Sequence, residues 1–243
     1  PKRIVYAEGE EDTILRAVQH LVDEGLVKPV LIGRPAVIER RIERLSLRIR
    51  PGVDFELCNV DDDPRYSDYW KLFLELGQRS GITPALAKSL VRSRPTLIAA
   101  LMVQRGEADA MICGIVGRYQ RQLRHILEVL PLDPGVSAPA AMTAVQNDRG
   151  TWFFVDTHVQ YDPTAEQIAE ATMQAVLRLK LFGITPKVAL LSHSNFGSHD
   201  NPSACKMRRV LSLVREQAPS LEIDGEMQAD TALNEEIREN IFP

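Results

Sequence analysis

The chain has 243 residues, of which 44% are hydrophobic and 26% charged, and its formal net charge is −4. This length suits one large or two smaller α/β lobes with sizeable cores, and the composition is that of an ordinary globular protein. The negative net charge argues against nucleic-acid binding, which needs clustered positive charge. No apolar stretch approaches the roughly 18 residues that span a bilayer, so we expect neither a nucleic-acid nor a membrane partner.

The three cysteines, Cys58, Cys113 and Cys205, are scattered along the chain. No CxxC or His–Cys spacing is present, so the sequence predicts neither a zinc site nor a disulfide framework. Few and unpaired cysteines are typical of a reducing compartment, and we expect a cytoplasmic protein. A strand follows Pro1 almost at once, so we also expect the chain to be cut from a longer protein.

Strands and helices alternate through the first half of the chain. Apolar runs predict strands at 4–7, 29–33, 55–60 and 109–113, with a possible extension at 47–49. Helical spacing of apolar residues predicts helices at 14–24, 36–45, 67–79, 95–105 and around 123–130. Another helix begins at Thr83-Pro84, where a hydroxyl N-cap precedes a proline at the first helical position.

The densest linker signal is Pro131-Leu132-Asp133-Pro134-Gly135, and we place a lobe boundary there, with lobes 1–134 and 135–243. In the second lobe we expect strands at 151–156 and 188–191 and helices at 163–182 and 203–217. Asp162 is the expected N-cap of the first of these helices. The alternation predicts an α/β fold with mostly parallel sheet in two doubly wound lobes.

A hydroxyl-rich loop follows the strand at 188–191 and reads Ser192-His193-Ser194-Asn195-Phe196-Gly197-Ser198. Strand, small polar loop and helix together point backbone N–H groups at an anion, at the sheet edge where ligands bind. The loop has neither the lysine of a Walker motif, nor GxGxxG spacing, nor a Gly-x-Ser-x-Gly elbow. The alternative is an ordinary loop whose hydroxyls cap the next helix, and His193 has no identifiable orienting partner.

Three arginines, Arg118, Arg121 and Arg124, follow the glycines of the segment 113–117 at spacings of three, so they can share part of a helical face. Guanidinium groups bind phosphate bidentately. The alternative is a solvated helix with scattered arginines.

A last strand is expected at 221–225, before a terminal helix. Two acidic sets, at the first and at this last strand, could hold a metal or polarise a substrate. The alternative is that they stay solvated or favour helix N-termini. The sets are Glu8, Glu11 and Asp12, and Asp224, Glu226 and Asp230.

Six stretches in order along nearly the whole chain carry a family resemblance. They are 5–11 (VYAEGEE), 28–35 (KPVLIGRP), 106–114 (GEADAMICG), 161–170 (YDPTAEQIAE), 189–198 (ALLSHSNFGS) and 224–230 (DGEMQAD). With them the chain resembles the phosphotransacetylase (phosphate acetyl/butyryltransferase) family. It is most similar to the phosphotransacetylase-like C-terminal domain of bacterial hybrid NADP-dependent malic enzymes.

The resemblance implies a two-lobed α/β fold like that of isocitrate and isopropylmalate dehydrogenases, with a cleft between the lobes. Active members bind coenzyme A and acetyl phosphate there. The 194–198 loop is similar to their phosphate-proximal loop, and Arg124 matches an arginine that helps bind the phosphoryl substrate. The expected ligand-binding residues are Ser192, Ser194, Asn195, Gly197, Ser198, Arg118 and Arg124. We expect no cofactor and no metal in this domain.

Two departures from active transferases bear on catalysis. The segment 117–121 (GRYQR) stands where they carry a threonine-rich stretch, and the chain ends before their closing Ser-Arg-Gly segment and downstream aspartate. We therefore expect no catalytic residue here, and some exposed apolar surface.

These departures favour a non-catalytic module over an enzyme. Such a module would bind acetyl-CoA as an allosteric inhibitor and hold a homo-oligomer together. It would regulate an upstream malic enzyme domain that uses NADP and a divalent metal to convert malate to pyruvate. The alternatives are an active phosphate acetyltransferase, which converts acetyl-CoA and phosphate to acetyl phosphate and CoA, and a dimerisation domain with an empty cleft.

Overall fold

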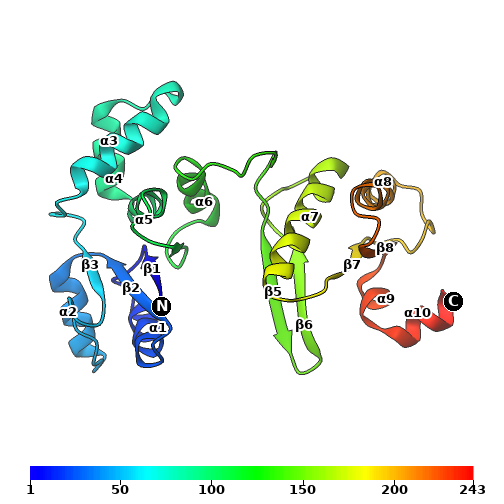
Figure 1. The fold of residues 1–243 in the computed structure, drawn as a ribbon, viewed down its shortest axis with the longest axis horizontal. Coiled ribbons are helices and arrows are strands. Elements are labelled where there is room, and N and C mark those ends of the chain that lie inside the picture. The colour runs from blue at the N-terminus through cyan, green and yellow to red at the C-terminus, as the bar shows by residue number, and fades with distance from the viewer. Residues whose placement is uncertain (243) are drawn as a thin grey trace. The chain divides into compact units, whose positions relative to one another are not determined.

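A parallel sheet of four strands forms the centre of the first of two units into which the chain divides, Pro1–Pro131 and Leu132–Pro243 (Figure 1). The computed structural model describes residues 1–242, apart from the side chain of Ile241. The strand order is β3-β2-β1-β4, and every neighbouring pair is parallel. The prediction of an α/β fold with a parallel sheet is confirmed for this unit.

The elements of the first unit follow the predicted alternation. They are β1 (Lys2–Tyr6), α1 (Asp12–Asp23), β2 (Val27–Ile32), α2 (Pro35–Arg44), β3 (Glu56–Cys58), α3 (Tyr66–Gly77), α4 (Pro84–Ser93), α5 (Pro95–Gln104), β4 (Ala110–Ile112) and α6 (Tyr119–Leu127), with a short 3-10 turn, η1 (Gln78–Ser80), after α3. The possible strand at 47–49 is wrong, because this segment has no strand pairing. Thr83 caps α4 as predicted, since its side chain accepts from the Leu86 N–H.

Successive side chains of β1 and β2 alternate between two hydrophobic cores, as the pleat of a strand requires. Val5 and Val30 join α3, α4 and α5 on one face of the sheet. Tyr6 and Leu31 join α1 and α2 on the other face. Figure 1 shows α1 and α2 on one side of this sheet and α5 on the opposite side. Helices therefore cover both faces of the parallel sheet.

The second unit holds two separate pairs of strands. Its elements are β5 (Met142–Asn147), β6 (Gly150–Val155), α7 (Ala165–Leu181), β7 (Lys187–Leu191), α8 (Pro202–Gln217), β8 (Glu222–Met227), α9 (Ala229–Leu233) and α10 (Glu235–Ile241). Strands β7 and β8 are parallel, whereas β5 and β6 form an antiparallel hairpin. The hairpin departs from the predicted mostly parallel sheet, and β5 was not predicted.

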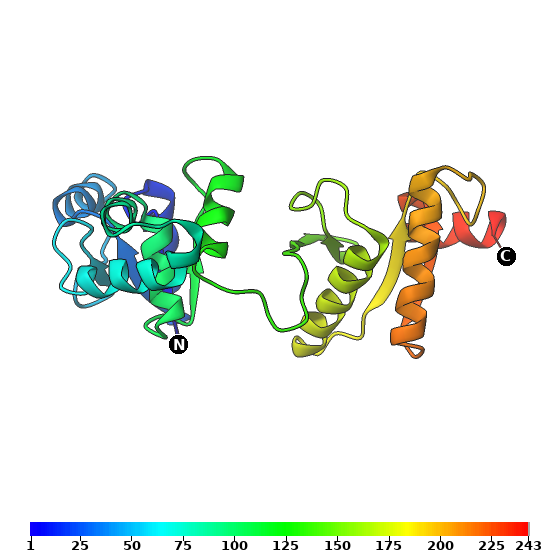
Figure 2. The ribbon, with the colours of Figure 1, turned by 90° about the horizontal axis from the view of Figure 1, so that it is seen from above.

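The long helix α7 begins two residues later than predicted. Its N-cap is Thr164, which forms a capping box with Gln167, and not Asp162. The Asp162 carboxylate instead pairs with Lys206 of α8. Figure 2 shows α7 and α8 side by side, and small residues of α7, Ala165 and Ala169, pack against Val210 and Val214 of α8. The same core includes Leu190 of β7 and Ile223 of β8, so the two helices support this pair of strands. The serine-rich loop follows the carboxyl end of β7.

None of the described helices is long and apolar enough to cross a membrane.

Candidate functional site

The serine-rich loop 192–198 leaves the carboxyl end of β7, directly beside the end of β8. Leu190 pairs with Gly225 and Leu191 with Met227, so Glu226 is the extra residue of a bulge in β8. A bulge of this kind redirects a side chain, and such bulges are frequent beside functional sites. Here the redirected side chain is a carboxylate, and it lies under the loop.

Glu226 is completely buried, and its Oε1 atom accepts three hydrogen bonds. The donors are the Ser194 hydroxyl at 2.9 Å, the Gly197 N–H at 2.8 Å and the Arg208 guanidinium at 3.0 Å. Burial favours the neutral acid, but the bonds from Gly197 and Ser194 and the charge of Arg208 outweigh it, so the pKa of Glu226 lies below its usual value. The second oxygen, Oε2, is buried and has no partner within residues 1–242.

The loop's backbone N–H groups are directed inward. The N–H groups of Ser192 and Phe196 donate to the carbonyl groups of Met227 and Glu226, each at 2.8 Å. Those of Ser194, Asn195, Gly197, Ser198 and His199 donate to acceptors in the loop or to the Glu226 carboxylate. The side-chain oxygen of Asn195, Oδ1, also accepts from the Gln228 N–H at 2.7 Å. The loop is therefore shaped by the end of β8.

The groups that face outward from the loop are side chains. The side-chain nitrogen of Asn195, Nδ2, has no hydrogen-bond partner in the described part of the chain, and the Ser198 residue is exposed. Phe196 is about 40% exposed and adopts a left-handed backbone conformation with φ 47°. A non-glycine residue in this region is strained, and such residues cluster at ligand sites. Neutral donors and an aromatic ring thus stand at the surface.

The helix after the loop is capped by its own asparagine. The Asn201 side chain accepts from the Ala204 N–H at 3.0 Å, so the alternative in which the loop's serines cap α8 is wrong. The Asn201 side chain also contacts the His193 ring, which supplies the partner that the sequence did not reveal. The His193 and His199 rings lie 6.0 Å apart.

The predicted arginines lie in the first unit, at the start of α6 and along it. The loop between β4 and α6 leaves the sheet where the strand order reverses, and in open α/β sheets ligands bind there. Glu8, after β1, accepts from the Gly114 N–H at 3.0 Å and so holds the loop that follows β4. Arg118 is the exposed N-cap residue of α6. The Arg124 side chain is 69% exposed and lies 3.6 Å from Glu128.

Most of the acidic residues singled out in the sequence have arginine partners. Glu11 and Asp12 lie near Arg41, and Asp224 pairs with Arg215 at 3.2 Å. In residues 1–242 no group of three or more His, Cys, Asp or Glu side chains could hold a metal ion.

The thiol of Cys113, at the end of β4, is kept protonated. Burial and the nearby Glu8 carboxylate raise its pKa to about 11, so it carries no nucleophilic thiolate at neutral pH.

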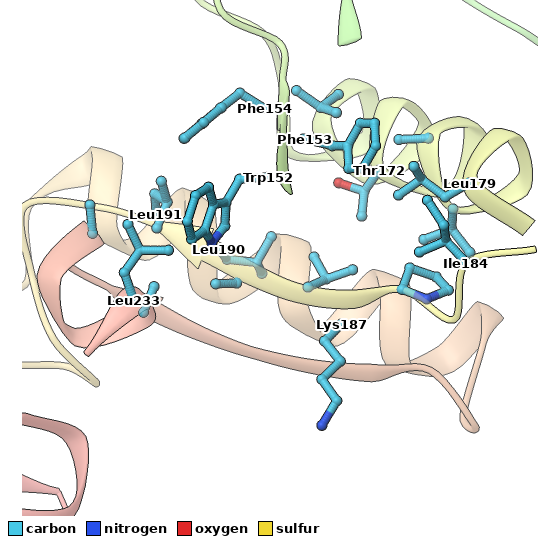
Figure 3. Close-up of a pocket in the computed structure, with 18 of the residues that line it drawn as sticks. Trp152, Phe153, Phe154, Thr172, Leu179, Ile184, Lys187, Leu190, Leu191 and Leu233 are labelled. Carbon is cyan, nitrogen blue, oxygen red and sulfur yellow. The ribbon is translucent and has the colours of Figure 1, made fainter. Parts of the chain in front are cut away.

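An apolar pocket of about 490 Å³ lies elsewhere in the second unit, between β6, α7, β7 and α9 (Figure 3). Trp152, Leu179, Leu190 and Leu233 contribute to its wall. The Thr172 hydroxyl in its wall donates to the Ile168 carbonyl, so it has no proton left to donate to a ligand (Figure 3). The pocket provides the exposed apolar surface expected from the sequence, but it lacks the convergent polar groups that orient a small molecule.

The structure thus brings together five of the predicted ligand residues, Ser192, Ser194, Asn195, Gly197 and Ser198, and assigns Arg118 and Arg124 to the other unit. The sequence missed Glu226 as the organiser of the loop and suggested it only as a residue that could hold a metal or polarise a substrate. The sequence shows only that Glu226 lies at the end of a strand. That position points to the loop only when β8 is known to pair with β7, from which the loop leaves.

Comparisons with known proteins agree with this architecture. A sequence profile of the family described as "Phosphate acetyl/butaryl transferase" matches residues 1–243. The chain is 51% identical over 243 residues to the NADP-dependent malic enzyme of Escherichia coli (strain K12), covering 100% of this chain and 32% of the relative. It is 50% identical over 241 residues to the NAD-dependent malic enzyme of Rhizobium meliloti (strain 1021), covering 99% of this chain and 31% of the relative.

Transferases are more distant relatives. The chain is 30% identical over 244 residues to the phosphate acetyltransferase of Synechocystis sp., covering 100% of this chain and 34% of the relative. The crystal structure of a phosphotransacetylase from Streptococcus pyogenes superposes with a TM-score of 0.86 at 25% identity, covering 100% of this chain and 73% of that chain. The chain therefore spans about a third of the length of its curated relatives. It belongs to the phosphate acetyl/butaryl transferase family.

Proposed function

We propose that the chain is a phosphotransacetylase-like regulatory and oligomerisation domain of a cytoplasmic malic enzyme. In this proposal the domain binds acetyl-CoA, which inhibits the oxidative decarboxylation of malate to pyruvate by a domain upstream in the same polypeptide. NADP and a divalent metal belong to that upstream domain. The observation that carries the proposal is the difference in identity: 50–51% with the malic enzymes, against 30% with the phosphate acetyltransferase.

Each unit contributes residues to the proposed binding of acetyl-CoA. Arg118 and Arg124 are exposed guanidinium groups and suit the phosphates of coenzyme A. The loop side chains, with Asn195 foremost, suit the acyl end. The uncommitted donors of Asn195 and the arginine at the start of α6 support this division.

The alternative function is an active phosphate acetyltransferase. It is supported by the full-length similarity to the Synechocystis enzyme and by the TM-score of 0.86 to the Streptococcus phosphotransacetylase. That reaction needs a group that removes the thiol proton of coenzyme A and donors for the developing anion. The backbone N–H groups of the loop already donate within the loop and to β8, so they do not serve such an anion, which favours the regulatory function.

A kinetic test uses the full-length parent protein. Malate oxidation should fall as acetyl-CoA rises, and the Arg124→Ala and Asn195→Ala variants should each weaken that inhibition about tenfold, the value of one lost charge-assisted or buried hydrogen bond. Arg16→Ala, at an exposed position of α1 outside the proposed site, is the control, and acetyl-CoA should inhibit this variant as strongly as the wild type.

Two outcomes would count against the proposal. Inhibition that is unchanged in both variants would remove the effector site from these residues. Formation of acetyl-CoA from acetyl phosphate by the parent, abolished by Arg124→Ala, would establish the transferase instead.

A further inference from the structure

Strand β5 exposes a sheet edge that no other strand of the described chain covers. It pairs with β6 alone, and all six of its residues, Met142–Asn147, are exposed. Edge strands of native proteins are normally protected from further pairing by lysine, proline, inward-facing charges, bulges or a very short length. The sequence MTAVQN has no charge, no proline and no glycine, and its register with β6 is unbroken. This edge is therefore open to pairing with another strand.

The hairpin of β5 and β6 also needs more support than two strands give each other. A two-stranded sheet is at best marginally stable in water, and a third strand or a packed helix is needed to stabilise it. Helix α7 contacts β6, and residues of β6 line the apolar pocket shown in Figure 3. Every residue of β5, by contrast, stays exposed. Further pairing at the β5 edge would therefore stabilise the hairpin.

A second copy of the chain supplies a strand that matches this edge. Two identical strands can pair antiparallel about a twofold axis normal to the sheet, so that each presents the same surface to the other. Because side chains alternate between the two faces of a strand, such an axis places one residue directly opposite its own copy. The strand order becomes β6-β5-β5-β6, and neither β5 strand keeps an open edge.

The register of the hairpin favours an axis at Val145. Val145 lies opposite Trp152 of β6, so pairing centred on Val145 places four apolar side chains in one row across the sheet, two from each copy. Val145 is 42% exposed in the single chain. Pairs of aromatic and β-branched residues are among the favourable cross-strand pairs. The twofold row therefore buries apolar surface that the single hairpin leaves in water.

The neighbouring pairs are compatible with this register. Ala144 lies opposite Gln146 of the second copy, and Thr143 lies opposite Asn147 of the second copy, so no two like charges meet. An axis at Ala144, the other central position, would place only an alanine pair at the centre, and alanine is depleted in strands. The composition of β5 thus favours a second copy of itself, paired around Val145.

We propose that β5 is the interface strand of a homodimer, in which two β5 strands pair antiparallel around Val145 and join two hairpins into one four-stranded sheet. This inference rests on the oligomerisation part of the proposed function and names the surface that carries it. It does not depend on the binding of acetyl-CoA.

Disulfide cross-linking in the full-length parent protein tests the pairing directly. Val145→Cys lies opposite its own copy, with the two Cα atoms about 4.5–5.5 Å apart, so it should form a covalent dimer on mild oxidation. Thr143→Cys is the matched control, because it lies on the same face of the same exposed strand. Its own copy lies four residues further along the paired strand, about 14 Å away, which is too far for a disulfide. It should form no more covalent dimer than the protein with its native cysteines.

Charge substitutions at the axis measure the contribution of the pairing to self-association of the parent. Val145→Lys places two like charges opposite each other and should raise the dissociation constant, measured by analytical ultracentrifugation, about tenfold. An equal mixture of Val145→Lys and Val145→Glu should associate more tightly than either variant alone, because opposite charges then meet. Gln146→Lys is the control on the same strand, since it faces the neutral Ala144 of the second copy, and it should associate like the wild type.

Each other outcome overturns the inference in a way that can be told apart from the proposed function. Equal cross-linking of Val145→Cys and Thr143→Cys contradicts the pairing around Val145, and so does equal weakening by Val145→Lys and Gln146→Lys. Self-association that is the same in every variant, with no cross-link at position 145, overturns the inference and leaves the proposed oligomerisation intact. It is the result expected if another strand of the same polypeptide covers β5. A parent that stays monomeric refutes both. If Val145→Lys fails to fold, the cross-link of the smaller Val145→Cys still decides.

Discussion

Replacing Glu226 by alanine should destabilise the second unit by about 3 kcal/mol. Removing one partner of a buried ion pair costs about 3–5 kcal/mol when the other charge is left buried. Here Arg208 keeps Asp200 as a partner and Gly197 is exposed to water, so both can be satisfied again. The Ser194 hydroxyl is completely buried and keeps only the Ser198 hydroxyl, at 3.2 Å, as an alternative acceptor, so we expect a cost at the lower end of this range.

The two tryptophans allow each unit to be measured by itself, since Trp70 lies in the first and Trp152 in the second. In a Trp70→Phe background, urea unfolding followed by tryptophan fluorescence reports on the second unit. Asp224→Ala is the matched control: it lies two residues earlier on β8, its side chain is 61% exposed, and its pair with Arg215 should contribute at most about 1 kcal/mol.

The reasoning would be refuted if Glu226→Ala and Asp224→Ala shifted the unfolding free energy equally. It also makes a prediction about pH. Because the folded-state pKa of Glu226 is lowered, its contribution is present in full above the unfolded-state pKa and is lost as the pH falls through the folded-state pKa. The difference between the wild type and Glu226→Gln should therefore be constant near pH 7 and shrink in acid below about pH 4.5, the ordinary value.

Two further predictions concern single positions. Tyr69→Phe removes a buried hydroxyl that donates to Glu107 at 2.6 Å, and it should cost about 1.5–3 kcal/mol in a Trp152→Phe background. Tyr66→Phe, which loses only a bond to a backbone carbonyl, should cost about 1 kcal/mol, and equal losses would contradict the charge-assisted bond. Gly225→Ala should abolish the loop's structure, because a Cβ there would lie 2.7 Å from the Leu190 carbonyl oxygen, and circular dichroism and Trp152 fluorescence would report it. Gly183→Ala meets no atom within 4 Å and should cost only about 1 kcal/mol, and equal effects would argue against the close contact.

The first unit could be predicted well because its burial pattern is strong. Val5 and Tyr6 of β1 lie in opposite cores, so the strand reads as a continuous apolar run between polar turns. Strand β5 could not be predicted in the same way. All six of its residues are exposed, so no apolar periodicity marks it, and its pairing with β6 is the only reason for its conformation.

The sequence holds two different helix-start patterns at the beginning of α7, and only one of them caps the helix. Both Asp162-Pro163 and Thr164 with Gln167 are helix-start patterns. The capping box forms, and Asp162 instead pairs with Lys206, forty-four residues along the chain. Glu226 was missed for a similar reason: its role exists only once the bulge in β8 turns it toward a loop that is remote in sequence.

The most direct test of the account is calorimetric titration of the full chain with acetyl-CoA. The account predicts saturable binding that Asn195→Ala and Arg124→Ala each weaken about tenfold, with Ser203→Ala and Arg16→Ala indistinguishable from the wild type. Binding that is the same in all five proteins, or no binding in the wild type, would contradict the proposed binding of acetyl-CoA by Asn195 of the serine-rich loop and Arg124 of α6.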